Sequence, residues 1–105
     1  MRTDHAHKTQ FEIDGSMQTV IKNLDNKRNE CQAFGLREQV TLLEEFGEGY
    51  IEYRDHQGGL LHWLIDLRRQ NGKTLVIIYS ANKGIGWEKA KKMYEYGAKG
   101  LPGCP

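Results

Sequence analysis

The sequence contains few cysteines and no long apolar segment. Its 105 residues include only Cys31 and Cys104, too few for the disulfide framework of a small secreted domain. We therefore expect two free thiols, Cys31 on the apolar stripe of a helix and Cys104 in a mobile tail. The longest apolar run, residues 75–79, is far shorter than the roughly 18 residues of a membrane-spanning helix. Residues 4–8 lack the apolar core of a secretory signal. These features predict a soluble, cytoplasmic protein that makes no contact with a membrane.

The common chemical motifs are also missing from the sequence. It contains no zinc-finger, P-loop, nucleophile-elbow or Ser/His/Asp pattern. His5 and His7 have a spacing that could chelate a metal, but no third ligand lies near them, and zinc usually takes three or four protein ligands. We therefore expect no cofactor and no metal.

Composition and charge favour one small globular domain. Hydrophobic residues make up 38% of the chain and charged residues 28%, which suits a folded domain rather than a disordered chain. Residues 37–67 carry two basic and seven acidic side chains, whereas residues 68–105 carry eight basic and two acidic ones. This asymmetry predicts either an anionic partner for the C-terminal third or head-to-tail self-association. Neutralisation of the two segments within one fold is the alternative.

The first half of the chain predicts a strand, a long helix and a second strand. Phe11 and Ile13 alternate with polar residues before the turn at residues 14–15. From Ser16, a suitable N-cap, apolar residues recur at helical spacing to the neighbourhood of Gly35, with a possible break at residues 25–26. Residues 36–46 suit a helix or a strand, and we favour the strand.

The second half predicts a strand, a β-hairpin and a C-terminal helix. Residues 50–54 have strand character. Asn71-Gly72 favours a type I′ turn, which would pair Gln70 with Lys73. This register places Trp63, Ile65 and Leu67 opposite Ser80, Ile78 and Val76 on the core face of the hairpin. Residues 87–96 suit a helix that ends at Gly97.

Together these elements predict an α+β domain over residues 1–105, with frayed ends at about 1–8 and 98–105. An antiparallel sheet, with the hairpin of residues 60–80 at its centre, would pack against the long N-terminal helix and be completed by the C-terminal helix. The other face of the hairpin carries Leu64, Leu75, Ile77 and Tyr79. This face predicts a homodimer surface.

The segment from Thr74 to Lys99 resembles a strand, loop and helix of the short-chain dehydrogenases, in which the cofactor loop often reads Asn-Lys-Gly-Ile-Gly, as residues 82–86 do here. Residues 79–83 also resemble that family's Tyr-x-x-x-Lys segment, although one stretch cannot serve both roles. Ser80 replaces the glycine of the tight turn, the chain ends before an acidic ribose ligand could follow, and residues 1–72 lack alternating parallel strands and helices. From this segment we retain a possible anion site at Lys83, Gly84 and Gly86, just before a helix N-terminus.

Two further groups of residues are candidate sites. His56 and His62 flank a glycine-rich turn near Arg54, and such a group could perform acid-base cleavage of RNA. A surface turn explains the same residues. The basic residues of the C-terminal third could follow a phosphate backbone, or form an ordinary solvated face. The members of this basic patch that we single out are Arg68, Arg69, Lys89 and Lys92.

The sequence by itself does not define a function. We predict a small binding module without catalysis that acts through a protein partner or an anionic ligand. The alternative is a small nuclease, or a nucleic-acid-binding protein that uses the basic C-terminal third.

Overall fold

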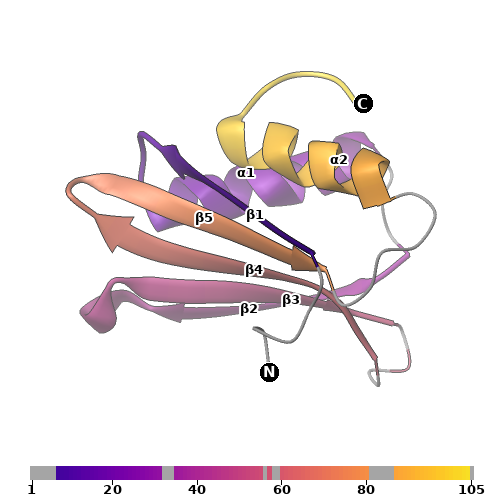
Figure 1. The fold of residues 1–105 in the computed structure, drawn as a ribbon, viewed down its shortest axis with the longest axis horizontal. Helices are drawn as coiled ribbons and strands as arrows, with labels where there is room; N and C mark the ends of the chain where they lie inside the picture. Colours follow the sequence, from indigo (N-terminus) through magenta and orange to yellow (C-terminus); the bar gives the residue numbers. More distant parts are fainter. Residues whose placement is uncertain (1–6, 32–34, 56, 58–59, 81–86, 105) are drawn as a thin grey trace.

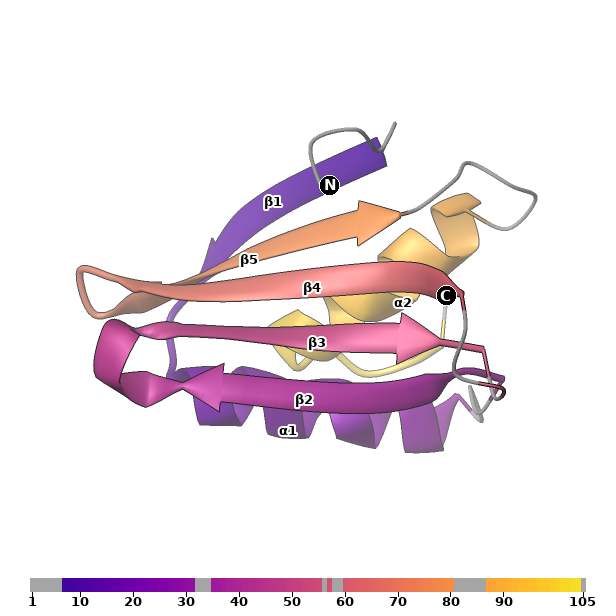
Figure 2. The ribbon, with the colours of Figure 1, turned by 90° about the horizontal axis from the view of Figure 1, so that it is seen from below.

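A five-stranded antiparallel sheet with two helices on one face forms the molecule (Figures 1 and 2). The computed structural model describes residues 7–31, 35–55, 57, 60–80 and 87–104. The strands lie in the order β1-β5-β4-β3-β2, which confirms the predicted α+β class. In chain order the elements are β1 (His7–Ile13), α1 (Met17–Glu30), β2 (Arg37–Leu43), the short 3-10 helix η2 (Glu44–Phe46), β3 (Glu48–Arg54), β4 (Leu61–Gln70), β5 (Lys73–Ser80) and α2 (Trp87–Lys99).

The β4–β5 hairpin has the register that its turn predicts. Asn71 and Gly72 both have positive φ, at 50° and 79°, as a type I′ turn requires. Gln70 pairs with Lys73, and Trp63 pairs with Ser80 at the far end of the ladder. β1 and β3 continue the sheet on the two sides of this hairpin. The hairpin is therefore central, as expected.

Helix α1 begins where the sequence predicts and ends earlier. Ser16 is the N-cap, and its hydroxyl accepts a hydrogen bond of 3.1 Å from the backbone N–H of Thr19. The helix continues through residues 25–26 without a break and ends at Glu30, with Cys31 as the C-cap. The expectation of a helix reaching Gly35 is corrected, because the C-cap at Cys31 lies well before Gly35. The ambiguous segment 36–46 is thus a strand followed by η2.

The core lies between the sheet and the two helices. Side chains alternate across a strand, so one face of β3, β4 and β5 supplies a continuous apolar layer. Helix α1 covers it with Met17, Val20 and Leu24, which recur at helical spacing. The fully buried sheet residues of this layer are Ile51, Tyr53, Ile65, Leu67, Val76 and Ile78.

Helix α2 passes Gly97 and ends at Lys99, which corrects the expected helix end. A Cβ on Gly97 would lie 2.9 Å from the Cβ of Lys27. Gly97 therefore allows a close approach of α2 to α1. Gly100, with φ of 70°, takes the left-handed conformation instead, which suits a residue just beyond a helix end.

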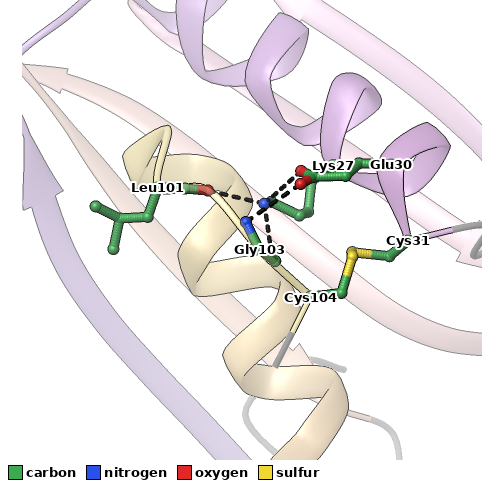
Figure 3. The surroundings of a disulfide bond; sticks show 6 residues. All are labelled: Lys27, Glu30, Cys31, Leu101, Gly103 and Cys104. Carbon is green, nitrogen blue, oxygen red and sulfur yellow. Dashed lines mark hydrogen bonds and ion pairs between the residues drawn. A yellow bond between two sulfur atoms is a disulfide. The ribbon is translucent and has the colours of Figure 1, made fainter.

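The C-terminal tail is attached to α1 by a disulfide between Cys31 and Cys104, as Figure 3 shows. This bond corrects the expectation of two free thiols. Ala98 is completely buried, and the described chain is bonded to α1 as far as Cys104. The sequence could not show this pairing, because the two cysteines are 73 positions apart and meet only through the packing of α2 on α1.

The sheet face opposite the helices remains open among the described residues (Figure 2). Leu64 and Ile77 lie on this face, yet they are only 5% and 6% exposed. Asp66 is also buried there. Within the described ranges, neither helix has the length and apolarity that crossing a bilayer requires.

Candidate ligand-binding cavity

A cavity of about 420 Å³ opens beside the disulfide, between the end of α1, helix α2 and the start of β4. This volume lies within the range of roughly 300 to 1,000 Å³ that is usual for small-molecule sites. Both sulfur-bearing residues, Cys31 and Cys104, contribute to its wall. Gly35 and Leu36, which lead into β2, contribute on another side.

Aromatic rings form one wall of the cavity. Trp63, near the start of β4, and Tyr94 of α2 both line it, with ring centroids 5.0 Å apart. Tyr94 also lies 5.0 Å from Tyr53 in the core behind it. Burial raises the pKa of Tyr94 well above that of a free tyrosine, so its phenol stays neutral at ordinary pH. The wall is therefore apolar and fixed by ring packing.

Arg28 of α1 brings a positive charge to the cavity. Its guanidinium donates a hydrogen bond of 2.7 Å to the carbonyl oxygen of Leu36 and lies 3.6 Å from the carboxylate of Glu38. It also stands over the ring of Tyr53, 5.2 Å from the centroid. The side chain is only 12% exposed. These contacts hold the guanidinium in place, and Glu38 offsets part of its charge.

Lys89 of α2 supplies a second cation at the cavity. Its side chain is exposed to solvent, and in the part of the chain that the structure describes no carboxylate pairs with it. Ala90 and Met93 of the same helix line the cavity between Lys89 and Tyr94. Helix α2 thus presents one apolar stripe with a lysine beside it.

The cavity combines an aromatic wall, aliphatic side chains and two cations. Such a lining suits a ligand with a flat or apolar body and one anionic group, because the body is removed from water while the charge meets Arg28 and Lys89. Met93 adds an adaptable apolar contact, since a thioether side chain adjusts to irregular shapes.

The predicted anion site at Lys83, Gly84 and Gly86 lies outside the described residues. His56 of the predicted nuclease group lies outside them as well. Arg54 and His62 are placed on neighbouring strands, because Arg54 pairs with Leu61 at a bulge that follows Tyr53. Arg54 donates a hydrogen bond of 2.8 Å to Glu52. The nuclease site stays a prediction.

The predicted basic patch is divided between two ends of the molecule. Lys89 lies at the cavity and Lys92 is exposed on the same helix. Arg69 lies six positions beyond Trp63 along β4, roughly 20 Å away at the rise of a β-strand. There Arg69 donates to the carbonyl oxygen of Glu44 in η2. Arg68 is exposed beside it. The structure therefore does not bring the four residues into one surface.

Sequence reasoning missed Arg28, Trp63 and Met93 as residues that line a cavity. Trp63 was placed on the core face of the hairpin, and nothing in its register distinguishes a cavity wall from a filled core. The sequence did contain one indication that Arg28 lies near Cys31. Arg28 precedes Cys31 by one helical turn, so the two residues lie on the same side of α1. The cavity itself depends on the packing of α2 on α1, which the sequence does not specify locally.

No family model matches the chain, and neither a curated protein nor a solved structure shows a significant match to it.

Proposed function

We propose that this protein is a small binding module without catalysis, and that its ligand is an organic anion with an apolar body. The observation that carries the proposal is the cavity between α1 and α2, which joins an aromatic wall to two cations. A protein partner is the alternative that the sequence left open.

Substitution of Lys89 distinguishes recognition of the ligand's charge from binding of its apolar body alone. It lines the cavity, is exposed and has no carboxylate partner among the described residues. A ligand anion would therefore find it available. Arg28 already bonds Leu36 and Glu38, so its substitution would disturb the end of α1 as well as the cavity.

The test is calorimetric titration with naphthoate, a planar apolar body with one carboxylate, and with the neutral naphthamide. We expect naphthoate to bind and naphthamide to bind more weakly, with the difference shrinking at high salt. Lys89→Gln should weaken naphthoate binding roughly two- to fivefold, the size of an exposed ion pair. Lys92→Gln removes the same charge from the same helix outside the cavity lining and should leave binding unchanged.

A second variant tests the cavity without altering charge. Ala90 is half-buried and lines the cavity, so Ala90→Leu should fill it and prevent naphthoate binding. Equal binding of naphthoate and naphthamide, or binding that survives Ala90→Leu, would contradict the proposal.

The homodimer and the cytoplasmic location stay proposals. Leu64 and Ile77 are already almost buried in one copy of the chain, so the open sheet face offers a partner less apolar area than the sequence suggested. The location matters for the disulfide, because disulfides of reducing compartments are usually transient or redox-sensing, whereas those of oxidising compartments are structural. Sedimentation at high protein concentration tests the dimer.

A further inference from the structure

The disulfide is part of the candidate cavity as well as a link between two segments. Cys31 is the C-cap of α1, and Cys104 belongs to the tail that follows α2. Both residues line the cavity. Arg28, which supplies one of the two cations, lies one helical turn before Cys31. Any change at the disulfide therefore acts directly on a wall of this cavity.

Hydrogen bonds also hold the tail, and Figure 3 shows that they converge on Lys27. Its ammonium donates to the carbonyl oxygens of Leu101 and Gly103, at 2.8 and 2.6 Å, and to the carboxylate of Glu30 at 2.7 Å. The N–H of Gly103 donates in turn to Glu30 at 3.2 Å. These bonds fix the tail as far as Gly103, while Cys104 itself is joined to α1 through its sulfur.

Cys104, the last described residue of the tail, would lose its attachment to α1 if the covalent link were broken. Residues 101–104 are exposed to solvent, and the bonds that Lys27 makes hold the tail only as far as Gly103. A chain end of this kind stays ordered only when it is tied down. The disulfide is the bond in this arrangement that water cannot replace.

We propose that the Cys31–Cys104 disulfide is a redox-controlled latch of the cavity, an inference that rests on the proposed function. In the oxidised protein Cys104 completes the wall, and the cavity holds its organic anion. A dithiol reductant opens the latch by thiol–disulfide exchange. One thiolate attacks a protein sulfur to form a mixed disulfide, and the second thiolate resolves it. Two electrons and two protons pass to the protein, which gains two thiols, while the reductant becomes a disulfide. The freed Cys104 leaves the cavity wall, and affinity for the anion falls.

The test is titration of the full chain with naphthoate in its oxidised form and after reduction by excess dithiothreitol. We expect the Kd to rise about tenfold on reduction, a change equivalent to ~1.4 kcal/mol. Reoxidation should restore the original affinity. The Cys31→Ser/Cys104→Ser variant should bind as weakly as the reduced protein and ignore dithiothreitol, which controls for any effect of the reductant on the ligand.

Folding is followed in the same samples by circular dichroism, so that loss of binding is assigned correctly. If the double variant does not fold, wild-type protein poised at graded redox potentials replaces it, with the reduced fraction measured by mass spectrometry. A reduced protein that stays folded and binds naphthoate with unchanged Kd would overturn the latch while leaving the proposed function intact. Unfolding on reduction would also overturn it, because the disulfide would then be purely structural. Absence of binding to the oxidised protein would overturn the proposed function and the latch together.

Discussion

The buried ammonium of Lys27 donates a hydrogen bond of 2.8 Å to the carbonyl oxygen of Leu101. Lys27 is only 4% exposed, and a lysine is rarely buried to this degree without partners. Leu101, Gly103 and Glu30 together take its three N–H donors. The lysine is thus a polar connection between α1 and the tail, on the side of α1 that faces α2.

Replacing Lys27 with methionine should loosen the tail. The hydrogen bond from Lys27 holds the pKa of Glu30 below its usual value, and Glu30 in turn accepts from the N–H of Gly103. We expect the Gly103 amide to exchange roughly tenfold faster, as loss of a charge-assisted hydrogen bond implies, and the pKa of Glu30 to rise. Both are measured by NMR. Lys22→Met, an exposed lysine on the same helix, should change neither quantity, and an unaltered Gly103 exchange rate in Lys27→Met would contradict the prediction.

Replacing Gly97 with alanine should destabilise the protein although alanine favours helix. The new Cβ would lie 2.9 Å from the Cβ of Lys27 and 3.2 Å from Leu24, so α2 must move away from α1. We expect a net loss of about 1–3 kcal/mol in the free energy of unfolding, measured by urea denaturation. Gly35→Ala is the control, because no atom lies within 4 Å of its added Cβ. Equal stability of the two variants would show that the contact between α1 and α2 accommodates the added methyl group.

Replacing Thr74 with valine should cost about 1–2 kcal/mol of stability. Thr74 is buried, and its hydroxyl donates a hydrogen bond of 2.7 Å to the carbonyl oxygen of Gly15. Valine keeps the shape and leaves this carbonyl without its donor. Thr41→Val, at a half-exposed position of the edge strand β2, should have little effect. Urea denaturation compares the two, and similar losses would rule out a specific role for the Thr74 bond.

Alkaline pH should weaken the fold through its buried tyrosines. Burial raises the pKa of Tyr53 and Tyr94, whereas the unfolded chain releases these protons near pH 10. The folded state therefore binds more protons than the unfolded state above that pH, and stability falls as pH rises; below about pH 9 the contribution is fully present. Tyr94→Phe should flatten the fall in the urea midpoint between about pH 9 and 11. A slope equal to that of the wild type would contradict this assignment.

Breaking the disulfide should lower global stability in addition to any effect on ligand. Cys31 and Cys104 close a loop across 73 positions of sequence, and the loss of unfolded-state entropy from such a loop contributes roughly 4 kcal/mol. We expect the Cys31→Ser/Cys104→Ser variant to unfold at a lower urea concentration. Its free energy of unfolding should fall by up to this amount. An unchanged urea midpoint would mean that the unfolded chain gains no conformational entropy when the disulfide is removed.

The elements that the sequence predicted correctly depend on local chemistry. Asn71-Gly72 specifies its own turn and hence the register of β4 with β5, and Ser16 caps the helix that follows it. Gly97 was interpreted as a helix end, because a glycine near the end of a helical pattern normally marks one, whereas here it is needed for contact with Lys27. That contact joins segments far apart in sequence. The cavity and the disulfide also depend on segments far apart in sequence, since both exist only after α2 has packed on α1.

The link between Cys31 and Cys104 makes a closed covalent ring that contains β2, β3, β4, β5 and α2. Strand β1 and helix α1 form an arm outside this ring, and β1 is held at the sheet edge by its pairing with β5. Detachment of the arm releases its chain entropy in full, whereas strands within the ring remain tethered even when their pairing is lost. Chain entropy therefore favours loss of pairing at β1 more than at β2, the other edge strand, which lies within the ring.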